Sequence, residues 1–185
     1  MKRLWALLTL MVFLCGCASE NTELNRVLSF REKLLSDCCS FTAEITADYG
    51  DQLYSFSVGC TADANGEVSF VVIAPESISG MSGKLKGDSG FLTFDDQVLA
   101  FPLLADGEVS PVSAPWLLIK TLRNGYISSA GKDGENIQVA MNDSYEEDAL
   151  QVDIWLNEED IPICADIMWQ GRRVLSMTIK DFAFV

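Results

Sequence analysis

The chain has 185 residues, of which 49% are hydrophobic and 22% charged, which excludes a disordered chain and a polytopic membrane protein. Its formal net charge of -14 makes binding to DNA or RNA unfavourable, because phosphates are repelled by such a surface. The sequence has no histidine, which excludes catalytic triads, general bases and zinc sites that depend on imidazole.

The N-terminus has the pattern of a secretory signal. Lys2 and Arg3 precede an apolar run from Trp5 to Leu14, which is too short to span a bilayer as a helix. The Leu14-Cys15-Gly16-Cys17 segment that follows resembles the bacterial lipobox. This resemblance implies that residues 1–16 are removed and that Cys17 carries a diacylglyceryl group, with at least two acyl chains such as palmitate. The alternative is an ordinary secretory signal with an incidental cysteine.

A lipid-anchored protein would lie on the outer face of the cytoplasmic membrane, and two acyl chains suffice for stable anchoring. Residues 17–21 would then be the acylated N-terminus and a short tether. Residues 20–37 have apolar positions near a 3.6-residue period, so we expect an amphipathic helix that lies on the folded domain.

From Ser40 the apolar period changes to two, which predicts a strand up to Tyr49. Gly50-Asp51 fits a two-residue hairpin loop before a second strand, over 52–62. Pairing Tyr49 with Gln52 sets Ile45 opposite Phe56. Further strands are expected at 67–74, 91–94 and 97–101, and residues 75–87 are interpreted as a glycine-rich linker.

A buried helix is expected over 113–125, with Ser113 as its N-cap, Pro115 in its first turn and Gly125 at its end. Five more strands follow, over 126–131, 135–141, 149–156, 161–169 and 174–182. No internal repeat or second domain is evident.

Four cysteines remain in the predicted mature chain: Cys38, Cys39, Cys60 and Cys164. An extracytoplasmic location permits disulfides. Cys38 and Cys39 are adjacent, and their Cα separation of about 3.8 Å is too short for a usual disulfide. Two cross-pairings remain: Cys39–Cys60 with Cys38–Cys164, and Cys38–Cys60 with Cys39–Cys164. The predicted register places Cys39 diagonal to Cys60 on the same face, which slightly favours the first. Four buried thiols are the alternative.

The order of elements resembles the LolA-like lipoprotein fold. Four segments carry the resemblance: F-x-A-x-[IV] at 41–45, PESISGMSG at 75–83, FDDQVL at 94–99 and APWLLIKTL at 114–122. It implies a mainly β (α+β) domain over residues 22–185. The domain would be an open half-barrel of about eleven antiparallel strands, with an N-terminal helix and a central plug helix on its concave face. The acidic, lipid-anchored character is closest to clostridial envelope lipoproteins, including germination lipoproteins of the GerS type.

The inner face of such a half-barrel forms either a closed core or a cavity for an acyl chain. The candidate ligand-lining residues are Phe41, Ile45, Phe56, Phe94, Phe101, Trp116, Ile119, Ile154, Trp169 and Met177.

Weaker candidates are interpreted as structural. The glycine-rich segment lacks phosphate-loop spacing, Ser82 and Lys84 lack an activating environment, and the acidic loop at 142–148 lacks the order of a calcium loop. Trp155 occupies an outward-facing position of its predicted strand, where it could contact a protein partner.

We therefore expect a membrane-anchored, non-catalytic envelope lipoprotein that binds a lipid or acyl chain in a concave cavity, without cofactor, metal or nucleic acid. The alternative is a protein-interaction lipoprotein in the form of a homodimer. As the GerS resemblance implies, it would dock on and position or activate a cell-wall enzyme in spore germination.

Overall fold

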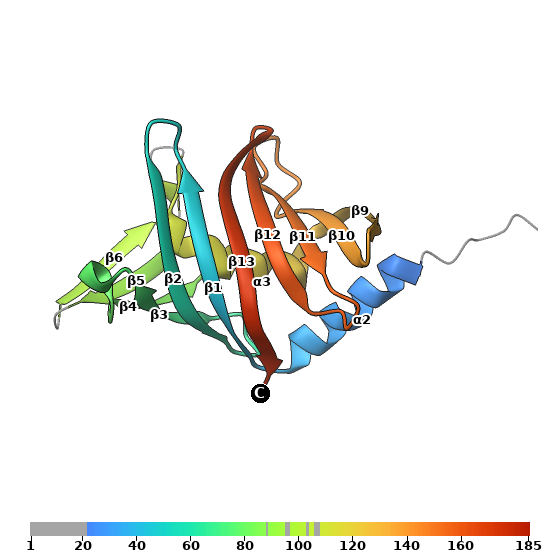
Figure 1. Cartoon of the computed structure of the whole chain (residues 1–185), viewed down its shortest axis with the longest axis horizontal. Coiled ribbons are helices and arrows are strands. Elements are labelled where there is room, and N and C mark those ends of the chain that lie inside the picture. Colours follow the sequence, from blue (N-terminus) through green and yellow to red (C-terminus); the bar gives the residue numbers. More distant parts are fainter. Residues whose placement is uncertain (1–21, 88, 95–96, 103, 106–107) are drawn as a thin grey trace, which may run out of the picture.

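Eleven antiparallel strands form one open sheet in the computed structural model, which describes residues 22–87, 89–94, 97–102, 104–105 and 108–185 (Figure 1). Of residues 94, 100–102, 104–105 and 108 it describes the backbone only. The order across the sheet is β6-β5-β4-β3-β2-β1-β13-β12-β11-β10-β9. The strands are β1 (Cys39–Asp48), β2 (Leu53–Ala62), β3 (Val68–Ala74), β4 (Ser82–Lys86), β5 (Ser89–Phe94), β6 (Gln97–Pro102), β9 (Tyr126–Asp133), β10 (Asn136–Asn142), β11 (Gln151–Leu156), β12 (Pro162–Trp169) and β13 (Arg172–Phe184).

The chain builds the sheet as two meanders that meet between β1 and β13. Six strands of this sheet precede the central helix and five follow it, and the sequence predicts each of them except β4. A separate pair, β7 (Leu104–Ala105) and β8 (Glu108–Val109), lies between the meanders in sequence. This arrangement confirms the expected open half-barrel.

The first hairpin has the predicted register. Ile45 lies opposite Phe56, and Ala43 lies opposite Val58. The Tyr49 amide donates to the carbonyl of Gln52 at 3.0 Å, and Gly50 has a φ of 87°. Glycine adopts this left-handed conformation without steric cost, so the Gly50-Asp51 pair determines where the strand turns.

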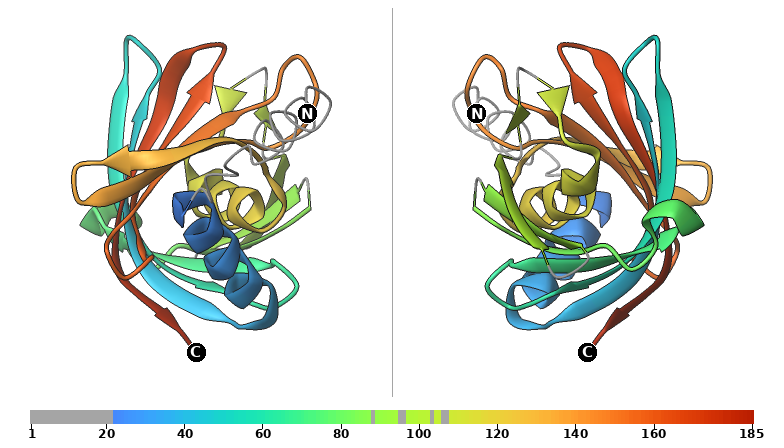
Figure 2. Two further views of the ribbon diagram at one scale, coloured as in Figure 1. Left: turned by 90° about the vertical axis from the view of Figure 1, so that its right-hand side faces the viewer. Right: turned by 90° about the vertical axis from the view of Figure 1, so that its left-hand side faces the viewer.

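Helix α3 (Ala114–Asn124) occupies the concave side of the curved sheet (Figure 2). It is apolar around most of its circumference, and Trp116, Leu118 and Ile119 are among its buried residues. The plug-helix prediction is therefore confirmed.

Helix α3 starts directly after Ser113, has Pro115 in its first turn and ends directly before Gly125, as predicted, but neither Ser113 nor Gly125 caps it in the usual way. Ser113 belongs to the short helix η2 (Pro111–Ser113), and its hydroxyl donates to Ser110 instead of capping α3. Gly125 has an extended conformation, with a φ of -67°. A Cβ at this position would lie 2.6 Å from the Thr121 carbonyl oxygen, so close backbone approach is what requires glycine here.

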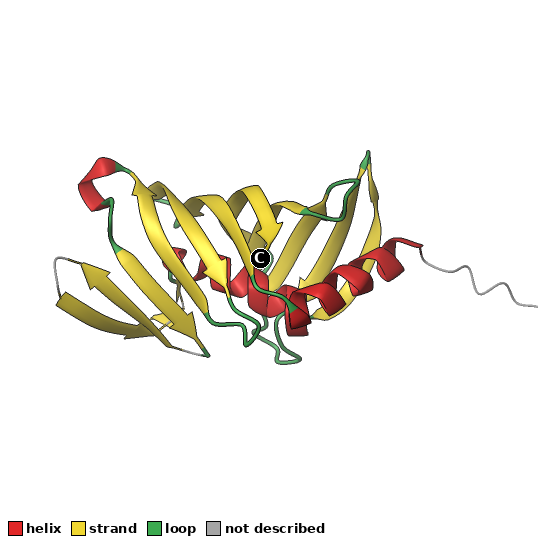
Figure 3. Cartoon of the chain, turned by 90° about the horizontal axis from the view of Figure 1, so that it is seen from below, coloured by secondary structure: helices red, strands yellow, loops and turns green. Residues whose placement is uncertain are grey.

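Helix α2 (Thr22–Ser36) packs beside α3 and along the ends of the second meander (Figure 3). Val27, Phe30 and Leu34 form its buried side. The ring of Phe30 lies 5.8 Å from that of Phe182 and 5.6 Å from that of Phe184, centroid to centroid. This aromatic contact joins the N-terminal helix to the last strand.

Two arginines connect α2 to the end of α3. Arg31 donates to the carbonyl oxygens of Leu122 and Gly125 at 2.7 and 2.8 Å. Arg123 donates in the opposite direction, to the carbonyl of Leu34 at 2.6 Å. Carbonyls at helix ends have no partners within the helix, so these guanidinium groups satisfy them.

Residues 75–87 are not simply the linker that the sequence predicts. They contain the short helix η1 (Glu76–Ile78) and strand β4, which pairs with both β3 and β5. Within β4 only Gly83 and Leu85 are buried, so its apolar pattern is too short to reveal a strand.

The concave face is packed with side chains. Residues such as Ile45, Val139, Ile154 and Leu156 from the sheet and Ile119 from α3 are at most 1% exposed and belong to one buried cluster. Among the described residues, no helix combines the length and apolarity needed to cross a bilayer.

Candidate ligand site on the outer face of the sheet

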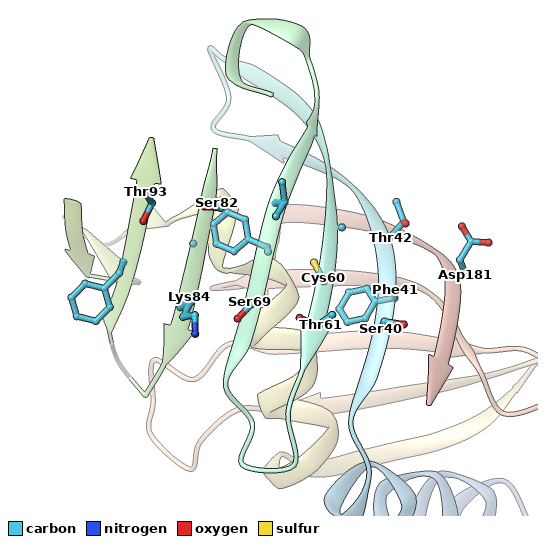
Figure 4. A pocket seen from close by; sticks show the side chains of 15 residues that line it. Ser40, Phe41, Thr42, Cys60, Thr61, Ser69, Ser82, Lys84, Thr93 and Asp181 are labelled. Carbon is cyan, nitrogen blue, oxygen red and sulfur yellow. The ribbon is translucent and has the colours of Figure 1, made fainter. Parts of the chain in front are cut away.

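A hollow of about 670 Å³ lies on strands β1 to β5 (Figure 4). We call it the outer hollow, because most of its lining residues occupy the strand positions that face away from α3. It is lined by Ser40, Phe41, Thr42, Gly59, Cys60, Thr61, Ser69, Phe70, Val71, Ser82, Gly83, Lys84, Phe91, Thr93 and Asp181. Its volume is typical of small-molecule sites.

The registers arrange these residues in three rows that cross the strands. The first outer row is Thr42, Gly59, Val71, Ser82 and Thr93, and the second is Ser40, Thr61, Ser69, Lys84 and Phe91.

Between the outer rows lies a third row, Phe41, Cys60, Phe70 and Gly83. These four residues are buried, and successive side chains of a strand point to opposite faces. The third row therefore contributes its backbone to the floor of the outer hollow, while its side chains belong to the interior.

Small side chains keep the floor accessible. Serine, threonine and glycine occupy seven of the ten positions in the two outer rows. Val71 and Phe91 provide apolar surface there and are 49% and 53% exposed. Five strands spaced about 4.8 Å apart make the hollow ~19 Å long. It can accept an elongated molecule with an apolar part.

The outer hollow has opposite charges at its two ends. Lys84 lies on β4, and Asp181 lies on β13, next to β1. The Lys84 ammonium is 3.5 Å from a carboxylate oxygen of Glu67, whose other oxygen is 3.9 Å from Lys86. One carboxylate is thus shared by two lysines.

Most of the predicted ligand-lining residues lie in the interior. Ile45, Trp116, Ile119, Ile154 and Met177 are each at most 5% exposed and belong to the buried cluster. Phe41 belongs to it as well and reaches the outer hollow from the floor row.

The remaining candidates are scattered. Phe56 is partly buried against the cluster, and Trp169 lines a separate hollow of about 340 Å³ beside Tyr49 and Arg172. The side chains of Phe94 and Phe101 lie outside the described residues, as does Cys17. The structure therefore does not gather the ten candidates around one hollow, and ligand contact by those in the interior stays a prediction.

The four cysteines are free thiols. Cys39 and Cys60 are buried and diagonal across the β1–β2 ladder, as predicted. Burial raises the pKa of Cys39 to about 11 and also raises that of Cys60. A disulfide between them stays a prediction.

The companion pair Cys38–Cys164 does not fit this fold. Cys39, the neighbour of Cys38 in the chain, lies opposite Phe184, and Cys164 lies opposite Thr178. Phe184 and Thr178 are six residues apart along β13. At about 3.3 Å per residue this is ~20 Å, whereas a disulfide joins Cα atoms less than about 7 Å apart.

Other sequence candidates have structural partners. Asp143, in the acidic loop, forms an ion pair with Lys120 at 3.1 Å and accepts the Leu150 amide. The Trp155 indole donates to Asp133 at 2.7 Å. Within the described part of the chain, no group of three or more Cys, Asp or Glu side chains is placed to hold a metal.

The outer hollow was not predicted from the sequence. The available signal lies in the outward-facing positions of the alternating strands, where the polar residues Ser40, Thr42, Thr61 and Ser69 have small side chains. Small polar residues on an exposed sheet face are ordinary, so only their alignment across five strands distinguishes them.

The comparisons with known proteins support the fold. No protein-family model matches the chain, and no curated protein has significant sequence similarity to it. An uncharacterized conserved protein from Thermus thermophilus has a similar structure, with a TM-score of 0.50 at 10% identity over 88% of this chain and 87% of that one. A DUF1329 family protein from Desulfovibrio piger gives a TM-score of 0.51 at 7% identity, over 86% and 90% of the two chains.

A LolA superfamily protein from Nitrosomonas europaea gives a TM-score of 0.44 at 12% identity, over 86% of this chain and 93% of that one. At these identities structural similarity concerns the fold alone. The eleven-stranded open sheet and its plug helix, described above, confirm the open half-barrel with a central helix that the sequence predicts.

Proposed function

We propose that this chain is a membrane-anchored, non-catalytic envelope lipoprotein that binds a hydrophobic ligand in the outer hollow. The anchor would be Cys17, five residues before the start of α2 at Thr22. Such a short tether would hold the domain close to the outer surface of the cytoplasmic membrane. The observation that carries the proposal is the hollow of about 670 Å³ on β1 to β5.

The outer hollow supports ligand binding better than the concave face does. On the concave side, Trp116 and Ile119 of α3 already cover the apolar residues of the sheet. On the outer side, Val71 and Phe91 remain about half exposed beside the backbone floor. Apolar surface that water can reach gains free energy when a ligand covers it.

Filling the outer hollow tests this function. Ser69 lies in the second outer row, and Ser176 lies on the same face of β13, away from the lining residues; both are half-buried. Ser69→Trp places an indole in the hollow, whereas Ser176→Trp adds the same side chain elsewhere on the sheet. Tryptophan is well tolerated in strands, so both variants should fold.

Binding is measured by calorimetry with monododecanoylglycerol below its aggregation concentration. All described elements lie within residues 22–185, so the domain without residues 1–17 serves as the protein. We expect the wild type and Ser176→Trp to bind alike, and Ser69→Trp to bind at least about tenfold more weakly, a loss of ~1.4 kcal/mol.

Absence of binding to the wild-type domain would contradict the proposal, as would equal binding by both tryptophan variants. Purification of the acylated protein from membranes tests the alternative of protein docking. A cell-wall enzyme that stays bound in place of a lipid would favour that alternative, which otherwise stays a prediction.

A further inference from the structure

We propose that the ligand of the outer hollow is an anionic amphiphile, with its head group at Lys84 and its chain lying across β3, β2 and β1. This inference rests on the proposed function and adds the chemical class and orientation of the ligand. It follows from the distribution of charge along the hollow and from the position of its apolar residues.

The first argument is that the hollow is electrically asymmetric. Among the described residues that line it, Lys84 and Asp181 are the charged ones, and they lie at opposite ends. An anionic group is therefore attracted to the β4 end and repelled from the β13 end. A cationic head group would have the opposite preference.

The second argument is that Lys84 can bind another anion. Its side chain is 68% exposed, and its ion pair with Glu67 is long, at 3.5 Å. Lys86 shares the same carboxylate at 3.9 Å. Exposed pairs of this kind contribute little free energy, so the Lys84 ammonium can turn toward a ligand without a large loss.

Two other basic side chains on the same face are more closely paired. Lys180 lies 2.7 Å from Glu44, and Arg173 lies 3.1 Å from Asp166. Neither lines the outer hollow. Lys84 is thus the lining side chain suited to bind a carboxylate or phosphate head group, even though the chain as a whole carries a net charge of -14.

The third argument is the surface available to the chain of the ligand. From β4 to β1 the hollow crosses three strand spacings, about 14 Å. Along this path lie Val71, the small Gly59, and the methyl groups of Thr42 and Thr61. A Cβ added at Gly59 would make only one ordinary contact, 3.7 Å to Ile73 Cδ1, so the site is open.

Two ligands with the same chain but different head groups provide the test. Dodecanoate is anionic at pH 8, and monododecanoylglycerol is neutral. Calorimetry is performed on the wild-type domain, on Lys84→Met, which keeps an apolar stem, and on the control Lys180→Met. Asp181→Asn tests the orientation of the ligand.

We expect Lys84→Met to weaken dodecanoate binding by about tenfold, or ~1.4 kcal/mol, and to leave monododecanoylglycerol binding unchanged. Lys180→Met should change neither affinity. Asp181→Asn should leave dodecanoate binding unchanged or strengthen it, because it removes a like charge.

The outcomes separate this inference from the proposed function. If the wild type binds the neutral ligand and Lys84→Met does not alter the preference for dodecanoate, the inference is wrong and the proposed function stands. If Asp181→Asn weakens dodecanoate binding as much as Lys84→Met, the orientation is wrong. If neither ligand binds to the wild type, the proposed function itself fails.

Discussion

Gly83 occupies a position in β4 where any side chain would collide with its neighbours. A Cβ built there would lie 2.6 Å from Cζ of Phe70, 2.7 Å from Cε1 of the same ring, and 2.7 Å from the carbonyl oxygen of Phe91. Carbon atoms in proteins rarely approach within 3.0 Å of each other without bonding. Gly83→Ala should therefore force β4 away from β5 or the Phe70 ring away from β4.

Neither movement is easy. The Phe70 side chain is 2% exposed and packed in the interior, so its ring can shift only by displacing other buried groups. The carbonyl of Phe91 belongs to the adjacent strand, which pairs with β4 on that side. Overpacking of this kind costs about 1–3 kcal/mol, which is ~2–4 °C in Tm per kcal/mol for a domain of this size.

Gly131→Ala provides the matched control. Gly131 is also a glycine in a strand, β9, and a Cβ there would meet nothing within 4 Å. Alanine restricts the unfolded chain more than glycine does, so this substitution should be neutral or stabilise the domain by up to about 1 kcal/mol.

The free energy of unfolding is measured by urea denaturation followed by circular dichroism. We expect Gly83→Ala to lower it by about 2 kcal/mol and Gly131→Ala not to lower it. Equal stability of Gly83→Ala and wild type would refute the packing argument. A similar loss in both variants would show that alanine is disfavoured in these strands for another reason.

Two further predictions concern stability. Arg31→Met removes the hydrogen bond to the Leu122 carbonyl at 2.7 Å and should lower the free energy of unfolding by about 2 kcal/mol. Arg173→Met breaks an exposed ion pair and should lower the free energy of unfolding by less than about 0.5 kcal/mol. Equal losses for Arg31→Met and Arg173→Met in the same urea assay would contradict this prediction. In the reduced protein, burial raises the pKa of the Cys39 thiol from 9.0 to about 11, so the protonated thiol contributes stability that is complete below pH 9 and is lost as pH rises toward 11. Urea unfolding between pH 8 and 11 should therefore show a steeper loss for wild type than for Cys39→Ala, and parallel curves would refute the assignment.

Local sequence patterns predicted the meanders well. In the first hairpin, alternating apolar residues define which face of each strand is buried, and Gly50-Asp51 defines the turn. Together these features determine the pairing of Ile45 with Phe56 before any long-range contact is considered. The plug helix was predictable for a similar reason, because its apolar residues cover more than one side.

Strand β4 shows where local reasoning fails. Its residues, Ser82–Lys86, include one large apolar side chain, Leu85, and they follow a segment rich in glycine and serine. Their strand conformation results from pairing with β3 and β5, which supply hydrogen bonds on both sides. Such pairing depends on partners that a local window does not contain.

The sequence by itself determined the alternation of apolar and polar residues along the strands, the hairpin turns, the apolar helix and the lipobox-like N-terminus. Each of these depends on residues close together in the chain. Only the tertiary structure decided that a hollow remains on the face of the sheet opposite α3. The lining of the outer hollow extends from Ser40 to Thr93 and includes Asp181. Its shape depends on how five strands and their small side chains align across the sheet, and that alignment exists only after the strands have paired.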